Sequence, residues 1–255
     1  MATSSASTAS TPAAASQASP MVMRIIGFCA LAHLINDLIQ SVLPAIYPML
    51  KANYDLSFAQ IGMITLTFQI TASLLQPWVG FFTDRRPTPN LLPLGTLCTL
   101  VGIVMLAFVG SFPMILLASA LVGIGSSTFH PETSRIARLA SGGRFGLAQS
   151  TFQVGGNTGS ALGPLLAAAI VIPFGQTHVA WFGLAGLFFF GVTLLLRRWY
   201  KEHLNQAKAR KAVEATHGLS RQRVIGALVV LGLLVFSKYF YMASFTSYFT
   251  FYLIE

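Results

Sequence analysis

Apolar residues gather along this chain in seven long runs that polar connections separate. The runs lie near residues 24–48, 58–82, 90–110, 112–134, 146–172, 179–198 and 224–253. A helix needs about 20 consecutive apolar residues to cross a bilayer, and these runs meet or approach that length. Only the connection after the sixth run is long. The pattern predicts an all-α polytopic membrane protein.

Polar and small residues recur at helical spacing within four of the runs. The clearest stripe belongs to the first run and consists of His33, Asn36, Asp37, Gln40, Pro44 and Tyr47. The second, fourth and fifth runs carry similar stripes, whereas the third and sixth are almost wholly apolar. Runs one to three therefore match runs four to six, which predicts an inverted repeat of three helices plus three, with runs three and six against lipid. For the Gly, Ser and Thr positions, the alternative that they only hold helices together stays open.

The runs divide the chain into four predicted parts. Residues 1–20 are mostly Ala, Ser and Thr without a charged side chain, which predicts a disordered tail. Residues 21–198 form a six-helix transmembrane domain, residues 199–223 a basic cytoplasmic linker, and residues 224–255 a seventh transmembrane helix. Such a linker is typical of a transporter with two halves, so the seventh helix is expected to begin a second half.

Composition and charge agree with a membrane location. Hydrophobic residues make up 54% of the 255 residues and charged residues 9%, against roughly a quarter charged in soluble domains. If the N-terminus is cytoplasmic, all but two of the 16 lysines and arginines fall on the cytoplasmic side, the exceptions being Lys51 and Lys238. This distribution predicts that orientation by the positive-inside rule. The net charge of +9 is therefore assigned to the anionic cytoplasmic leaflet and not to nucleic acid.

The chain shows no sequence pattern typical of a cofactor or a metal site. Cys29 and Cys98 each lie inside an apolar run, where small hydrophobic packing is the expected role. His33 and His130 lack the spacing of a metal site in the sequence. A membrane-embedded enzyme would need a clustered nucleophile or metal set. We therefore expect no cofactor, no metal and no enzymatic activity.

Asp37 and His33 lie one helical turn apart near the expected bilayer midplane. Ionisable groups are costly at that depth and are functional by default. Asp37 is the predicted carrier of a coupling proton, which His33 would share or tune. A buried hydrogen-bonded pair that only holds helices together is the alternative.

The fourth run ends in a charged segment around Pro131. It places His130, Glu132 and Arg135 at or just inside the membrane boundary. Pro131 predicts a kink or a break beside these charges, because proline frees a backbone carbonyl. Glu132 and Arg135 are expected to join the Asp84–Arg85 pair in a cytoplasmic gate, a surface ion pair of little energy being the alternative. His130 is either a gate member or a second protonation site.

Two short motifs resemble signatures of the major facilitator superfamily. The first lies after the second run, where Gly80 is followed by Asp84 and Arg85, with Arg85 available to pair with an acid such as Glu132. This sequence resembles the superfamily's loop motif, although Pro-Thr-Pro follows where the family has a glycine and basic residues. The second motif, in the fifth run, resembles the superfamily's antiporter motif and consists of Gly159, Gly163 and Pro164. Small residues there would bring helices together, and the proline would bend the axis.

Longer stretches resemble one family within that superfamily, the fosmidomycin resistance proteins. They lie at residues 33–37, 44–48, 57–62, 129–135, 141–144, 149–156 and 237–241. The resemblance implies a twelve-helix efflux transporter of the bacterial inner membrane that exports a phosphonate antibiotic against proton entry. Because this chain ends after the seventh run, we expect a truncated sequence, with a half-transporter plus one helix as the alternative.

Lys238 lies halfway along the seventh run, on one face with Tyr241. An ammonium in a partly dry cavity suits an anionic phosphonate. Lys238 and Tyr241 are therefore predicted to bind substrate, together with Asn36 and Gln153 from the polar stripes. The competing role for Lys238 is a salt bridge to Asp37.

The sequence thus predicts a six-helix bundle like that of the major facilitator superfamily, followed by a seventh helix. Its predicted function is proton-coupled antiport of fosmidomycin-like phosphonates or related small anions. The alternatives are a membrane receptor or scaffold that binds without transporting, and an inactive truncated transporter. The expected partners are the substrate, protons and lipid; the oligomeric state is left open.

Overall fold

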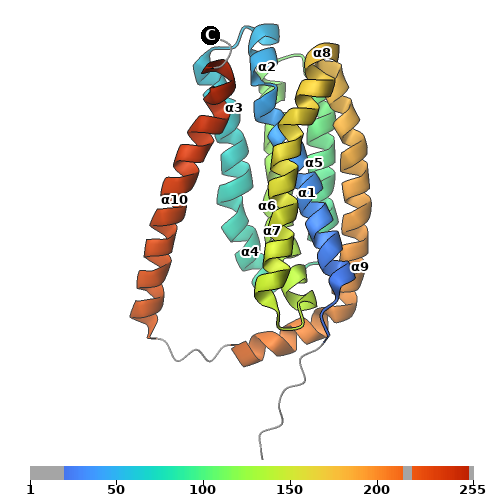
Figure 1. Ribbon diagram of the computed structural model, residues 1–255, viewed down its shortest axis with the longest axis vertical. Helices are drawn as coiled ribbons and strands as arrows, with labels where there is room; N and C mark the ends of the chain where they lie inside the picture. The colour runs from blue at the N-terminus through green and yellow to red at the C-terminus, as the bar shows by residue number, and fades with distance from the viewer. Residues whose placement is uncertain (1–19, 215–219, 253–255) are drawn as a thin grey trace, which may run out of the picture.

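The computed structural model describes residues 20–214 and 220–252, which form a bundle of long helices (Figure 1). In chain order the elements are α1 (Met23–Ala45), α2 (Tyr47–Tyr54), α3 (Phe58–Gln69), η1 (Ile70–Leu74), α4 (Leu75–Arg85), α5 (Leu91–Ala107), α6 (Phe112–Ala140), α7 (Phe145–Leu166), η2 (Ala167–Val171), α8 (Ile172–Phe174), η3 (Gln176–Ala180), α9 (Trp181–Glu214) and α10 (Arg221–Tyr252). Within the described ranges the chain contains no strand. The predicted all-α class is confirmed, whereas the predicted tail lies outside the described residues apart from Pro20.

Among the described residues, six helical spans are long and apolar enough to cross a membrane. They are Met23–Ala45, Phe58–Arg85, Phe112–Ala140, Phe145–Phe174, Gln176–Leu204 and Arg221–Met242. The third predicted run corresponds to α5, a shorter apolar helix. The sixth span continues as α9 to Glu214, so much of the predicted linker at residues 199–223 is helical.

α1 and α6 form the centre of the bundle (Figure 1). α1 packs on α7, α9 and α6, whereas α6 packs on α3, η1, α4 and α5. α1 of the first three spans therefore packs on helices of the next three, and α6 of the next three packs on helices of the first three. α1 and α6 thus occupy equivalent places in the two units. This is the arrangement of a 3+3 inverted repeat. The outward faces of α5 and α9 are apolar and exposed, as a lipid-facing role requires; they include Leu94, Leu97, Val101, Leu184, Leu187 and Phe188.

Glycines allow α7 to approach α1 closely. A Cβ on Gly155 would collide with the carbonyl oxygen of Ala30, and one on Gly159 with that of Leu34. A Cβ on Gly163 would lie 2.5 Å from the carbonyl oxygen of Leu38. Any larger residue would have to push the two helices apart, since backbone cannot yield as a side chain does. The antiporter-like motif therefore packs directly on the first span.

The second and fifth spans each contain one π-helical turn, η1 and η2, at corresponding places in the repeat. A proline follows each turn, Pro77 in α4 and Pro173 in α8. The carbonyl that each proline ring would meet, four residues earlier, belongs to Ser73 or Ala169, and both residues lie in the π-helical turns. The wider turn accommodates the proline without ending the span.

Pro131, which lies inside the fourth span, behaves differently from these. α6 continues through Pro131 as one helix to Ala140, so of the predicted kink or break, the break does not occur. Gly80 of α4 lies against it, since a Cβ built there would be 3.8 Å from the Pro131 Cβ. The charged segment after Pro131 therefore belongs to the same rigid helix as the apolar part before it.

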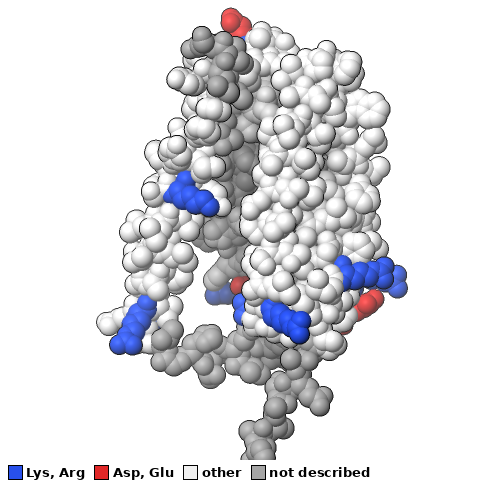
Figure 2. Space-filling view, in the orientation of Figure 1, with Lys and Arg blue, Asp and Glu red and all other residues white. Residues whose placement is uncertain are grey.

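α10 stands away from the bundle along most of its length and approaches α2 and α3 near its C-terminal end (Figure 1). There the Tyr248 hydroxyl would lie 3.0 Å from a Cβ on Gly62. The described side chains of α10 are exposed. Basic side chains gather at the opposite end of the molecule, with one group halfway along α10 (Figure 2). That basic end is the side predicted to be cytoplasmic.

Candidate functional site

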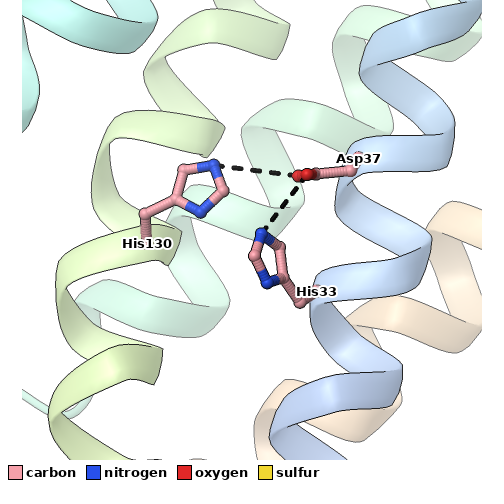
Figure 3. Close-up of side chains that lie close together, drawn as sticks. All are labelled: His33, Asp37 and His130. Carbon is pink, nitrogen blue, oxygen red and sulfur yellow. Dashed lines mark ion pairs between the residues drawn. The ribbon is translucent and has the colours of Figure 1, made fainter. Parts of the chain in front are cut away.

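Asp37, His33 and His130 meet between α1 and α6 (Figure 3). The Nε2 atom of His33 lies 3.3 Å from Asp37 Oδ2, and that of His130 lies 3.8 Å from Asp37 Oδ1. The two imidazole rings are 5.0 Å apart between centroids and nearly perpendicular. His33 and Asp37 are i and i+4 on α1, which brings them together automatically. His130 reaches them because α6 crosses α1 at this depth.

His33 is held from its other side by α7. Its Nδ1 lies 2.8 Å from the backbone carbonyl oxygen of Phe152, and its ring stacks on the Phe152 ring at 4.0 Å. A carbonyl oxygen only accepts hydrogen bonds, so Nδ1 donates and carries a hydrogen. Nε2 is therefore the atom presented to Asp37. Gly156 leaves room for this arrangement, because a Cβ there would lie 2.5 Å from His33 Nε2.

Two neutral side chains also approach the Asp37 carboxylate. Asn36 Nδ2 donates to Oδ1 at 3.0 Å, and Ser160 Oγ donates to Oδ2 at 3.5 Å. The Asp37 side chain is 18% exposed, whereas the His33 side chain is 4% exposed. The carboxylate can thus be reached from the open face of the bundle, and His33 supports it from within.

These three ionisable residues also form a possible ligand set for a metal ion. One ligand atom from each of His33, Asp37 and His130 lies within 4.8 Å of the other two. The expectation that the two histidines lack the spacing of a metal site is therefore wrong. Spacing along the sequence carried no information here, because the residues come from two helices that cross.

A second ionic cluster lies toward the basic end of the bundle, where α4 meets α6. Arg135 pairs with Glu132 on its own helix and, at 2.7 Å, with Asp84 on α4. Both terminal nitrogens of Arg135 also donate to Thr83 Oγ1 at 3.1 Å. The predicted association of Glu132, Arg135 and Asp84 is thus present in the geometry.

The interior of this second cluster is dry. The Glu132 side chain is 0% exposed, whereas that of Asp84 is 56% exposed. Within the described part of the chain, Glu132 Oε2 is buried without a hydrogen-bond partner. Tyr200 of α9 is buried beside the pair and interacts electrostatically with both Glu132 and Arg135. The pair is therefore not the surface ion pair that was the alternative.

Arg85 does not join this cluster in the way the sequence suggested. It is the last residue of α4, and its guanidinium folds back over the ring of Phe81 at 3.9 Å. Glu132 is paired by Arg135 instead, which lies one turn away on the same helix and needs no interhelical reach. The predicted pairing of Arg85 with Glu132 is wrong.

The predicted substrate residues do not converge on Asp37 as one group. Asn36 is buried beside it, but Gln153 is exposed and donates to Asn157 at 3.2 Å. Lys238 lies on α10 with its ammonium 5.4 Å from the Tyr239 ring centroid, and Tyr241 is 67% exposed. No ion pair of Lys238 occurs among the described residues, so the alternative salt bridge to Asp37 is not present.

Three groups that contact the two clusters were not identified from the sequence. They are the Phe152 carbonyl, the Thr83 hydroxyl and Tyr200. A backbone carbonyl leaves no sequence signal at all. Thr83 lies inside the loop motif, one residue before Asp84, and could have been found there. A tyrosine two residues after the arginines that end the sixth apolar run was the available signal for Tyr200.

Comparison with known proteins gives a family and curated relatives. The family model of the Major Facilitator Superfamily matches residues 29–255. The fosmidomycin resistance protein of Escherichia coli (strain K12) is 56% identical over 231 residues, which cover 91% of this chain and 57% of that protein. The uncharacterized MFS-type transporter YfnC of Bacillus subtilis (strain 168) is 39% identical over 212 residues, covering 82% of this chain and 51% of that protein. The chain thus spans about half the length of the curated relatives it matches.

Solved structures of transporters share the fold. A bacterial homologue of the human lysosomal transporter Spinster, inward-facing and occupied, aligns with a TM-score of 0.59 at 16% identity, over 70% of this chain and 44% of that chain. A mutant of the peptide transporter POT in complex with alafosfalin aligns with a TM-score of 0.55 at 18% identity, over 86% and 46%. At such identities the likeness concerns the fold alone. Together with the curated relatives, these matches confirm the predicted resemblance and fold class.

Proposed function

Because this chain belongs to the Major Facilitator Superfamily, we propose that it forms the helix bundle of a membrane transporter that exports small anionic compounds in exchange for protons. The observation that carries the proposal is the Asp37 carboxylate, partly exposed on a membrane span and faced by two imidazoles. An ionisable residue at such a place is a functional candidate by default. Imidazole is also the side chain whose charge most readily changes near neutral pH.

The cluster of Asp37, His33 and His130 is proposed to carry the coupling proton. With both imidazoles neutral, the cluster holds one negative charge, and uptake of one proton removes it. Because charge is costly within a membrane, the two protonation states favour different surroundings. A helix arrangement that exposes the cluster and one that closes over it would therefore change in relative population on protonation.

A fosmidomycin-like phosphonate is the substrate class we propose. The support is the 56% identity to a protein named for fosmidomycin resistance. Lys238 and Tyr241 on α10 and Gln153 on α7 have exposed side chains, so each of them is available to a ligand. Asn36 would act from beside Asp37, which would bring substrate and proton near each other.

The cluster of Glu132, Arg135 and Asp84 is proposed as a cytoplasmic gate. Its contacts differ in kind, because the Glu132–Arg135 pair lies within α6 whereas Arg135 reaches α4 through Asp84 and Thr83. Movement of α4 away from α6 would break only the contacts between helices. The intrahelical pair would keep Arg135 charged and in place for the return. The basic end of the bundle would then face the cytoplasm of a bacterial inner membrane.

The proposal is tested by flux into inverted membrane vesicles that contain this chain. Radiolabelled fosmidomycin should accumulate when a pH gradient is imposed, and Asp37→Asn should reduce accumulation to that of vesicles without the protein. Asp55→Asn is the matched control, because Asp55 is exposed at the end of α2 in a left-handed conformation that Asn also adopts. It should transport normally.

The same assay separates the alternatives. Accumulation that ignores the pH gradient, or persists unchanged in Asp37→Asn, would refute proton coupling at this residue. Saturable binding of the drug without accumulation would instead favour a receptor or scaffold. The absence of both binding and flux would favour an inactive chain.

A further inference from the structure

The Asp37 cluster has a property that proton exchange alone does not require: the Nε2 atoms of two imidazoles face one carboxylate. The Nδ1 of His33 carries a hydrogen, because it donates to the Phe152 carbonyl at 2.8 Å. In the neutral imidazole, Nε2 then has a lone pair, and this lone pair faces Asp37 Oδ2 at 3.3 Å. Two acceptors at this distance need a cation between them, either a proton or a metal ion.

A backbone carbonyl behind a histidine is a recurring feature of metal sites. It fixes the tautomer and the ring orientation, so that the other nitrogen is ready to coordinate. Phe152 supplies this carbonyl and also stacks on the ring at 4.0 Å. His33 is thus held in place before any ion arrives, at no further cost in side-chain entropy.

The distances also suit a tetrahedral ion after a small adjustment. Ligand atoms at the usual 2.0–2.1 Å from Zn²⁺ lie about 3.3–3.4 Å from one another. The two histidine–carboxylate separations here are 3.3 Å and 3.8 Å, and all three ligand atoms lie within 4.8 Å. The longer histidine–carboxylate separation belongs to His130, whose side chain is 23% exposed, and closing it would require that side chain to rotate.

We propose that His33, Asp37 and His130 bind a divalent transition metal ion such as Zn²⁺. Two imidazoles and one carboxylate suit Zn²⁺ or Co²⁺, whereas Mg²⁺ and Ca²⁺ prefer oxygen ligands. The partial exposure of Asp37 and His130 gives the ion an entry path and leaves a fourth position for water. Since this is the cluster of the proposed proton site, the inference rests on the same residues, and a bound ion would replace the coupling proton and inhibit transport.

Binding is tested directly with Co²⁺, whose visible absorption reports tetrahedral coordination. The chain is purified with a histidine-free affinity tag, and Zn²⁺ is then added to compete. We expect one saturable Co²⁺ site that Zn²⁺ displaces. His33→Gln, Asp37→Asn and His130→Gln should each weaken it at least about tenfold, by comparison with the loss from milder changes around metal ligands.

The matched control is His203→Gln. His203 lies on α9, away from the cluster, with its ring stacked on Trp199. It should leave Co²⁺ affinity unchanged. Equal affinity in the wild type and all three cluster variants, or no Co²⁺ spectrum in the wild type, would overturn the proposal.

A gain of signal guards against variants that merely misfold. His130→Cys places a thiolate at the same position and should add a sulfur-to-cobalt charge-transfer band. Wild type should lack this band, although it holds Cys29 and Cys98. Absence of the band in a folded His130→Cys protein that still binds Co²⁺ would exclude His130 as a ligand.

Failure of the metal site and failure of the proposed transport function give different results. If Asp37→Asn loses Co²⁺ affinity but keeps pH-driven flux, the metal inference stands and the proton assignment falls. If Asp37→Asn loses flux while the wild type binds no Co²⁺, the proton assignment stands and the metal inference falls.

Discussion

Two ionisable clusters lie on α6, one on each side of Pro131, and they differ in chemistry and in tightness. The cluster reached through His130 contains a carboxylate and imidazoles, with separations of 3.3 and 3.8 Å. The cluster reached through Glu132 contains a guanidinium, which stays charged, and its interhelical contacts lie at 2.7–3.1 Å. One cluster therefore contains imidazoles, whose charge changes near neutral pH, whereas the other is built around a fixed positive charge.

The difference indicates how a single helix can serve two tasks. A loose cluster whose groups exchange protons contributes little to holding helices together, because its ionic contacts are long and its carboxylate is partly exposed. A tight cluster with a buried carboxylate contributes to the stability of the bundle, because breaking it would leave a buried charge without a partner. We therefore expect substitutions in the two clusters to separate function from stability.

The largest loss of stability is expected from Arg135→Gln in the tight cluster. It would leave the fully buried Glu132 carboxylate without a cation, at a cost of about 3–5 kcal/mol in the free energy of unfolding. Thermal unfolding in detergent measures it. The double variant Glu132→Gln/Arg135→Gln should recover part of the loss, because no unpaired charge remains. A double variant as unstable as the single one would contradict this reading.

A smaller loss of stability is expected from Gly159→Leu, which disturbs the packing of α7 behind the cluster of His33, Asp37 and His130. The new side chain would collide with the Leu34 carbonyl of α1 and force α7 outward, at a cost of about 1–3 kcal/mol. The His33–Phe152 hydrogen bond would lengthen with it, so flux should fall as well. Gly146→Ala in the same helix is the control, since nothing lies within 4 Å of a Cβ there. Equal stability of the two variants would show that α7 does not need its close approach.

Within the loose cluster itself, Asp37→Asn should change stability by no more than about 1 kcal/mol. Asn keeps the shape of the side chain and can donate toward the His33 Nε2 lone pair. The variant should therefore melt close to the wild type although it has lost pH-driven flux. A melting temperature as low as that of Arg135→Gln would remove the distinction between the clusters.

The smallest effect is expected from Arg85→Gln, within about 0.5–1 kcal/mol for an exposed cation over an aromatic ring. Arg85 lies on Phe81 and does not pair with Glu132. Asp84→Asn is the informative comparison, because it removes an interhelical partner of Arg135. If Arg85→Gln impaired flux more than Asp84→Asn, the gate would involve Arg85 in another state.

Much of the fold could be predicted from the sequence, because hydrophobic runs and helical polar stripes follow directly from the chemistry of a bilayer. The pairing of His33 with Asp37 was predictable for the same reason, since i and i+4 always meet on a helix. His130 was harder. Whether it faced Asp37 or the charged segment beyond Pro131 depended on the depth at which α6 crosses α1, and local spacing does not encode that depth.

The remaining misses have physical causes of their own. Arg85 was assigned to Glu132 because opposite charges near one boundary attract, yet Arg135 lies closer to Glu132 along the same helix. Pro131 was expected to kink or break α6, but the helix continues to Ala140 with Gly80 of α4 against the proline. A local ion pair within α6 decided the first case, and the continuity of α6 decided the second.

The π-helical turn at residues 70–74 sets a rotational phase for everything beyond it. Such a turn amounts to one residue inserted in an α-helix, and one residue of an α-helix corresponds to a rotation of about 100°. Deleting a single residue there would restore a regular helix and swing Thr83 and Asp84 away from Arg135 by that angle. The π-helical turn therefore determines which residue the loop motif contacts, although it lies two turns or more before the motif. A short insertion or deletion there can rotate a whole helix face without altering any residue of the motif.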